Sequence, residues 1–135
     1  MEQKENIEER LRATGVKPTS QRLEIGALLL AKPQHMSADQ ILSKLQQNGS
    51  KVSKATVYNT LKLFTDQGLI RAVSVDPTRQ FYDSTTGHHH HFYNVDSGQL
   101  IDIDSDELQF SQLPDLPEGT EAQDIEVVVR VCNTT

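Results

Sequence analysis

Four consecutive histidines, His88–His91, stand in the interior of the chain and are the residues best suited to carry chemistry. Strand-forming residues on both sides of a Gly-containing turn predict a β-hairpin, with one arm over residues 91–95 and the other over residues 100–103. Side chains alternate between the two faces of a strand, so His89 and His91 point to one face and the other two histidines to the opposite face. Two imidazoles at i and i+2 can bind one metal ion.

Two carboxylates are placed to complete such a site. Asp102, on the returning arm, can reach the same ion as His89 and His91, and Asp83 precedes the run by a short turn. A mixed nitrogen and oxygen ligand set suits Mn, Fe or Zn better than copper(I) or an iron–sulfur cluster. The alternative is a solvated His-rich loop or an expression tag. A tag usually lies at a terminus, whereas this run is internal.

Length and composition limit the class of protein. A chain of 135 residues fits one domain or two very small ones. No apolar stretch approaches the roughly 18 residues of a membrane span, and no signal-peptide core follows Met1. We therefore expect a cytoplasmic protein with no membrane partner. The single Cys132 excludes an internal disulfide and a four-cysteine zinc site within one chain.

The charge is distributed unevenly. Residues 1–83 hold 12 Lys and Arg against 9 Asp and Glu, whereas residues 84–135 hold one basic residue, Arg130, and 10 acidic ones. Within residues 15–75 there are 8 basic and 3 acidic side chains. This asymmetry indicates two parts with different partners.

Apolar periodicity and capping residues predict four helices and two strands in the first half. The helices are 3–14, 19–32, 37–48 and 54–67, and the strands are 69–75 and 79–83. A short Gly-containing turn joins the third and fourth helices, as in a helix-turn-helix, and a two-stranded ribbon then follows. This order predicts a winged helix, with His35 in a loop before the third helix.

The second half predicts a small sheet. Alternation over Ala122–Val131 is typical of a strand with one apolar face, and Glu107–Leu113 is the stretch that could form a short helix. Three strands and at most one short helix cannot bury a full core, so we expect this half to dimerise. The expected fold class is α+β: a winged helix-turn-helix over residues 1–83, then a small α/β dimerisation domain over residues 84–135 with a three-stranded antiparallel sheet.

Helix 54–67 is the candidate for reading DNA. Tyr58 and Asn59 could contact base edges, while basic side chains hold phosphates or a narrow minor groove. The alternative is a helical interaction module without a nucleic-acid partner, although the following ribbon favours DNA. The candidate DNA-binding residues are Lys17, Arg22, Lys51, Lys54, Thr56, Tyr58, Asn59 and Lys62.

Three motifs together resemble the ferric uptake regulator family along essentially the whole chain. They are the segments 35–41 (HMSADQI) and 55–61 (ATVYNTL) and the His-run hairpin. The resemblance implies a dimeric, metal-responsive, DNA-binding transcription factor that is not an enzyme and whose operator is an AT-rich palindrome.

The resemblance also implies a regulatory metal site. The family places a His before the third helix, an acidic residue at the end of the wing, an H-x-H pair and an acidic residue on the next strand. The corresponding residues are His35, Asp83, His89, His91 and Asp102. One divalent metal per subunit, Fe²⁺ or Mn²⁺, or Zn²⁺ in the protein as isolated, would bridge the two halves and set their relative angle.

Many relatives carry a structural zinc bound by two Cys-x-x-Cys pairs. Asn94, Ser97 and Thr135 occupy three of these four positions, so that zinc is expected to be absent.

A further family site uses the other face of the His run. Its candidate metal or haem ligands here are His88, His90, Glu107 and Asp124, the last of which stands where the family usually has a His.

The signal is not decided by these motifs. The lost cysteines and the long His run look most like the iron response regulator branch, which senses haem, although the Cys-Pro haem motif of that branch is missing here. Asp102 is also found in peroxide-responsive repressors, where bound Fe(II) reacts with peroxide and oxidises the ligands corresponding to His35 and His89. We expect a response to iron or haem status, with peroxide sensing by an iron- or manganese-loaded repressor as the alternative.

Two functions of other classes compete with a regulator. The His and Asp residues could hold an activating metal in a metallohydrolase, but no general acid–base Glu or substrate loop lies near the His run. A passive metal buffer would not need a winged helix.

Overall fold

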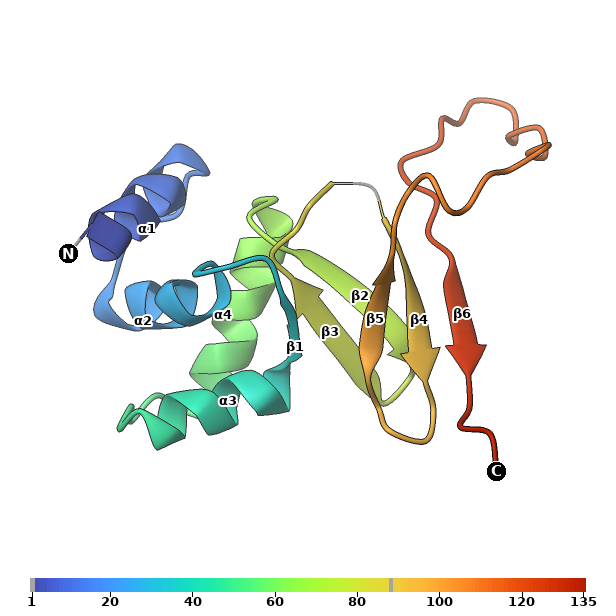
Figure 1. The fold of residues 1–135 in the computed structure, drawn as a ribbon. Coiled ribbons are helices and arrows are strands. Elements are labelled where there is room, and N and C mark those ends of the chain that lie inside the picture. Colours follow the sequence, from blue (N-terminus) through green and yellow to red (C-terminus); the bar gives the residue numbers. More distant parts are fainter. Residues whose placement is uncertain (1, 88) are drawn as a thin grey trace. The chain divides into compact units, whose positions relative to one another are not determined.

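The computed structural model describes residues 2–87 and 89–135, and it divides into two compact units, Met1–Thr86 and Gly87–Thr135 (Figure 1). In the part of the chain that the structure describes, no helix is long and apolar enough to cross a membrane.

The N-terminal unit begins with four helices. They are α1 (Glu2–Ala13), α2 (Ser20–Leu29), α3 (Ala38–Gln47) and α4 (Lys54–Asp66). All four expected helices are present, although α2 ends at Leu29 rather than at the predicted Lys32.

Side-chain caps determine where three of these helices start. Thr19, Ser37 and Ser53 each accept a hydrogen bond from a backbone N–H in the first turn of the helix that follows. Before α3, the Gln40 side chain also accepts from the Ser37 backbone N–H at 2.9 Å, which completes a capping box. The predicted capping residues therefore set the start of α2, α3 and α4.

Glycines in the left-handed region follow the other ends of α1, α3 and α4. Gly15, Gly49 and Gly68 have φ angles of +82°, +84° and +76°. A side chain with a Cβ is strained at such angles, so glycine lets the chain leave the helix while the last carbonyls stay hydrogen-bonded. The short turns at residues 48–53 and 67–70 thereby set the directions of α4 and of the two strands that follow it.

The helices enclose one apolar core. α1 packs on α2, α2 on α3 and α4, and α3 on α4. The core side chains come from all four helices, from the segments that follow them and, with Tyr82, from the sheet described next: Ile7, Leu11, Val16, Ile25, Leu29, Leu30, Ala38, Ile41, Leu45, Val52, Val57, Leu61, Phe64, Leu69, Ile70 and Tyr82. Because α4 contributes Val57, Leu61 and Phe64 from one face, its opposite face is left to solvent.

An antiparallel sheet completes the winged helix. Its order is β1–β3–β2, with β1 at His35–Ser37, β2 at Arg71–Asp76 and β3 at Arg79–Asp83. The predicted ribbon corresponds to β2 and β3. The expectation that His35 lies in a loop was wrong, because His35 begins β1 and is the register partner of Asp83. A strand of three residues is too short to show alternation in sequence.

The C-terminal unit is a second three-stranded sheet, in the order β5–β4–β6. β4 (His90–Asn94) and β5 (Leu100–Ile103) form the predicted hairpin, while β6 (Val128–Val131) lies on the other side of β4. β4 and β5 are antiparallel as expected, but β6 runs parallel to β4. The α+β fold class is confirmed, and the sheet of this unit is mixed.

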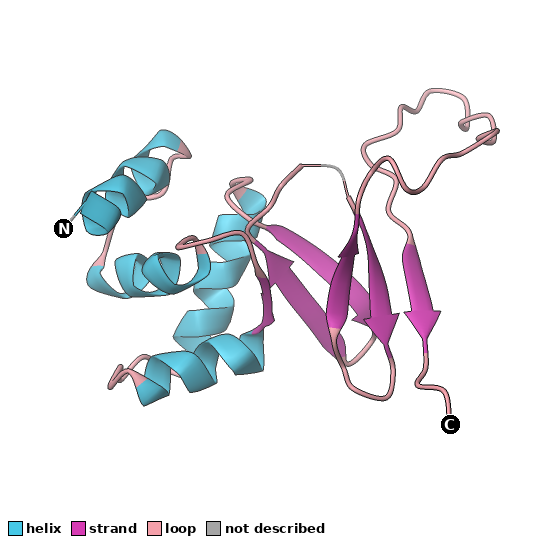
Figure 2. Ribbon diagram, viewed as in Figure 1, coloured by secondary structure: helices cyan, strands magenta, loops and turns pink. Residues whose placement is uncertain are grey.

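A long irregular segment, residues 104–127, connects β5 to β6 (Figure 2). A parallel neighbour requires such a crossover of a dozen or more residues. The helix considered at Glu107–Leu113 does not form in it, and the strand expected from Ala122 starts only at Val128. Prolines at 114 and 117 and the many like charges disfavour regular structure in this segment.

Candidate metal centre and DNA interface

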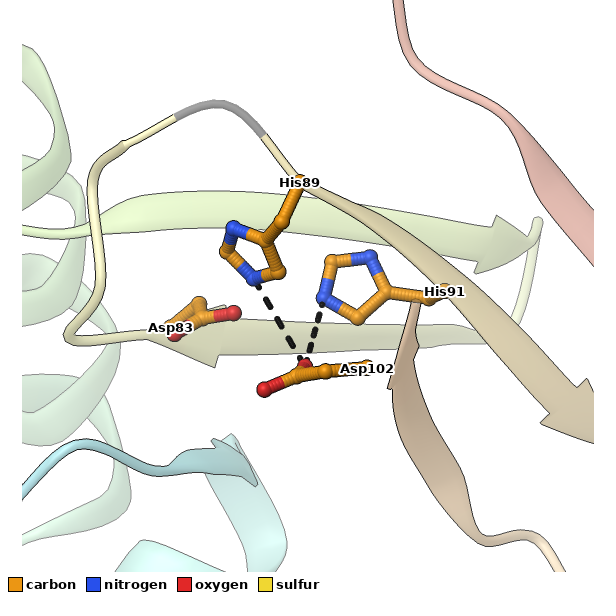
Figure 3. Close-up of side chains that lie close together, drawn as sticks. All are labelled: Asp83, His89, His91 and Asp102. Carbon is orange, nitrogen blue, oxygen red and sulfur yellow. Dashed lines mark ion pairs between the residues drawn. The ribbon is translucent and has the colours of Figure 1, made fainter. Parts of the chain in front are cut away.

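The β4–β5 hairpin brings His89, His91 and Asp102 together (Figure 3). His91 and Asp102 are register partners on neighbouring strands, so their side chains leave the sheet on the same face. His89 lies two residues before His91 and shares that face. The Asp102 Oδ1 atom lies 3.6 Å from His89 Nε2 and 3.3 Å from His91 Nε2.

These three side chains fit a divalent metal ion. Donors bonded to one ion at about 2.0–2.2 Å lie roughly 3–4.4 Å from each other, and the ligand atoms here lie within 4.8 Å of one another. His89 Nδ1 is 2.9 Å from the Gly87 carbonyl oxygen. With the proton on Nδ1 and donated to that carbonyl, the Nε2 lone pair faces Asp102. A backbone acceptor of this kind commonly orients a metal-binding histidine.

The site is unevenly exposed to solvent. The side chain of His91 is 1% exposed and that of His89 11% exposed, whereas that of Asp102 is 54% exposed. The two imidazoles are thus largely buried, whereas the carboxylate of Asp102 is in contact with solvent.

Two further predicted ligands lie side by side in the N-terminal unit. His35 and Asp83 are partners in the β1–β3 ladder, and Asp83 is 1% exposed. The Thr85 backbone N–H donates to Asp83 Oδ1 at 2.8 Å, and the His35 ring meets Phe81 edge-on. Figure 3 includes the side chain of Asp83.

The structure gives little support to a second site on the other face of the His run. His88 lies outside the described residues. His90 Nδ1 accepts a hydrogen bond from the Val127 backbone N–H at 2.9 Å, so a neutral ring carries its proton on Nε2 and has no lone pair left for a metal. Within residues 2–87 and 89–135, no group of three potential ligands includes His90, Glu107 or Asp124. The second site stays a prediction.

Polar side chains join the β4–β5 turn to the C-terminal segment. Asn94 Nδ2 donates to Asn133 Oδ1 and the Asn133 backbone N–H donates to Asp96 Oδ2, both at 2.8 Å. Cys132, between these contacts and β6, is exposed. Hydrogen bonds therefore fasten the end of β6 to the hairpin.

The exposed face of α4 carries the candidate DNA-reading residues. Lys54, Tyr58, Asn59 and Lys62 are exposed, and Tyr58 is 42% exposed. The Lys54 ammonium lies 5.8 Å from the centre of the Tyr58 ring. An aromatic ring beside a cation on one helix face can meet base edges and a phosphate at the same time.

Two hollows flank this face. One lies toward α2 and the other toward β2 and β3, and Asn59 lines both. Arg22 and Thr56 line the first hollow, whereas Tyr58 and Lys62 line the second. The remaining predicted phosphate contacts, Lys17 and Lys51, are exposed on the loops before α2 and before α4.

One residue of this surface escaped the sequence prediction. Asp66 accepts a hydrogen bond from the Lys62 ammonium at 2.8 Å, and this bond together with the carboxylate charge raises the pKa of Lys62. The i, i+4 spacing could have revealed the pair. In the second hollow, burial and then the nearby Tyr58 raise the pKa of Tyr82.

The fold matches proteins of known structure. The ferric uptake regulator of Pseudomonas aeruginosa, solved with manganese, is 28% identical, with a TM-score of 0.70 over 93% of this chain and 96% of that one. The ferric uptake regulator of Francisella tularensis, solved with iron, is 27% identical, with a TM-score of 0.71 over 88% of this chain and 92% of that one.

Sequence comparisons agree. The peroxide-responsive repressor PerR of Staphylococcus aureus (strain USA300) is 31% identical over 98 residues, which cover 73% of this chain and 66% of the repressor, just under two thirds of its length. A model described as the ferric uptake regulator family matches residues 13–130. This chain therefore belongs to the ferric uptake regulator family.

Proposed function

We propose that this chain is a metal-dependent transcriptional regulator that binds double-stranded DNA as a homodimer. The observation that carries the proposal is the grouping of His89, His91 and Asp102 in a chain that also holds a winged helix with an exposed, basic α4 face. Family membership supports the same function. A metallohydrolase is disfavoured, because the named relatives are repressors and uptake regulators.

The proposed regulatory site holds one divalent ion that is shared by the two units and controls DNA binding. His35 and Asp83 of the N-terminal unit would join His89, His91 and Asp102 as ligands, and only five residues separate Asp83 from His89. Bound Fe²⁺ or Mn²⁺ supplies a positive centre that holds nitrogen and oxygen donors together. Ligands from both units would thereby fix the orientation of α4 relative to the C-terminal sheet, and so the spacing of two α4 helices in a dimer.

Apolar surface on the C-terminal sheet supports the dimer. Ile101 on β5 and Val129 on β6 are both register partners of Phe92 on β4, so the three side chains form a row across one face. Ile101 is 44% exposed and Val129 37% exposed. A second copy would remove this row from water.

The first test is metal-dependent DNA binding. Fluorescence anisotropy should show that Mn²⁺ tightens binding to an AT-rich palindromic duplex by about 5- to 150-fold, the usual range of coupling between two sites. A scrambled duplex of the same composition should gain much less. Equal affinity for the palindrome with Mn²⁺ and with a chelator would contradict the proposed metal control of DNA binding.

Peroxide is a second candidate signal, and the relatives favour it. The Staphylococcus aureus repressor, which is 31% identical to this chain, is named as peroxide-responsive. A response to iron or haem status is the alternative.

Mass spectrometry separates these signals. If peroxide is the signal, Fe²⁺-loaded protein treated with hydrogen peroxide should gain one oxygen atom on a peptide that contains His35 or His89. Mn²⁺-loaded protein is the control and should not gain it. An unmodified Fe²⁺ sample, together with a shifted Soret band after haem addition, would favour haem instead.

A further inference from the structure

Two polar residues, Gln34 and Ser84, hold the strand ends that carry His35 and Asp83. The Gln34 backbone N–H donates to Ser84 Oγ at 3.0 Å, and the Ser84 backbone N–H donates to the Gln34 carbonyl at 3.0 Å. The Ser84 hydroxyl lies 3.1 Å from the Lys32 carbonyl oxygen and 3.2 Å from that of Gln34, so it donates to one of them. We call this group of contacts the Gln34–Ser84 clasp.

The clasp extends the β1–β3 ladder by one position. Gln34 precedes His35 and Ser84 follows Asp83, and His35 and Asp83 are themselves register partners. Hydrogen bonds therefore hold two consecutive residues of one strand, Gln34 and His35, against two of the other, Asp83 and Ser84. This restricts the backbone freedom that His35 and Asp83 would otherwise lose when they bind an ion.

The clasp also reaches α2. The Gln34 side-chain amide donates to the carbonyl oxygens of Leu28 at 2.9 Å and of Leu29 at 3.1 Å. These carbonyls belong to the last turn of α2, which no further helical turn satisfies. The Leu29 side chain is fully buried in the core, to which α4 contributes Leu61 and Phe64.

We infer that Gln34 and Ser84 are positioning residues that preset His35 and Asp83 for a divalent cation and tie these ligands to the C-terminal end of α2. The inference rests on the proposed function, because it requires His35 and Asp83 to be metal ligands. The pair supports the two ligands through their neighbouring backbone, in addition to the hydrogen-bond partners that metal-binding side chains usually have. Through Gln34, hydrogen bonds connect the residues next to the proposed ligands to α2, which packs on α4.

The test is a Mn²⁺ titration of full-length variants by calorimetry. Ser84→Ala should weaken Mn²⁺ binding by about 10-fold, the lower end of the cost of removing a hydrogen-bond partner of a metal ligand, because Ser84 holds the backbone beside Asp83 rather than its carboxylate. Ser84→Thr, which keeps the hydroxyl, should restore most of the affinity. Ser74→Ala removes an exposed serine from β2 of the same sheet and should leave the affinity unchanged. Gln34→Ala keeps the backbone contacts and so provides a folded variant if Ser84→Ala is unstable.

Two readouts separate positioning from mere stability. The absorption bands of bound Co²⁺ report the ligand set and should differ between wild type and Ser84→Ala. Mn²⁺ should slow amide exchange at residues 28–34 in wild type and not in Gln34→Ala. A lower melting temperature with unchanged Mn²⁺ affinity and unchanged Co²⁺ bands would overturn the inference.

His35→Ala distinguishes the inference from the function on which it depends. If His35→Ala weakens Mn²⁺ binding while Ser84→Ala and Gln34→Ala do not, the inference alone fails. If His35→Ala leaves Mn²⁺ binding unchanged, the shared metal site fails and the inference fails with it.

Discussion

Replacing His89 by Ala should weaken Mn²⁺ or Fe²⁺ binding by more than about 100-fold, because loss of a ligand should cost more than loss of its support. His89 supplies one of the two imidazole nitrogens that face Asp102 in the C-terminal unit. Without it, His91 and the exposed Asp102 are the only ligands that the C-terminal unit contributes to the proposed site. Calorimetry at fixed pH measures the affinity, and the same variant should lose the Mn²⁺-dependent gain in DNA binding.

His90→Asn is the matched control for this variant. It changes the next residue on the opposite face, and the Asn side-chain oxygen can replace His90 Nδ1 as the acceptor of the Val127 N–H. Its Mn²⁺ affinity should stay within a few-fold of wild type. A His89→Ala protein that binds Mn²⁺ as tightly as wild type would place the site elsewhere.

Replacing Tyr58 by Ala should weaken binding to the palindromic duplex by about 1–3 kcal/mol, the usual contribution of one good base contact. Tyr58 is exposed in the middle of the α4 face and lies beside the Lys54 ammonium. Fluorescence anisotropy with Mn²⁺ present gives the change. Tyr58→Phe separates the ring from the hydroxyl, because a loss confined to Tyr58→Ala assigns the contact to the ring.

Two lysine variants calibrate this result. Lys62→Ala should cost less than Tyr58→Ala, because Asp66 already neutralises part of the Lys62 charge. Lys44→Ala removes an equal charge from the last turn of α3 and should leave the salt dependence of binding unchanged. Unchanged affinity of Tyr58→Ala would exclude Tyr58 from DNA reading.

The sequence predicts the helices well because their signals are local. The caps at Thr19, Ser37 and Ser53 each lie within three residues of the backbone N–H that they accept. The grouping of His89, His91 and Asp102 is also predictable, since alternation and a short hairpin turn determine which side chains share a face.

Long-range features could not be predicted in this way. Alternation along β6 is the same whether its neighbour is parallel or antiparallel. The predicted antiparallel direction of β6 was therefore wrong. The acceptor role of His90 depends on Val127, which lies 37 residues away. Gln34 and Ser84 are 50 residues apart, and neither residue type signals the other.

The long crossover 104–127 affects the order in which the C-terminal sheet can fold. Every proposed ligand of the shared ion lies at or before Asp102, whereas β6 begins only at Val128. Docking of β6 must also overcome the entropy of closing that connection, which favours the hairpin as the earlier structure. The hairpin can therefore bring His89, His91 and Asp102 together before β6 joins the sheet.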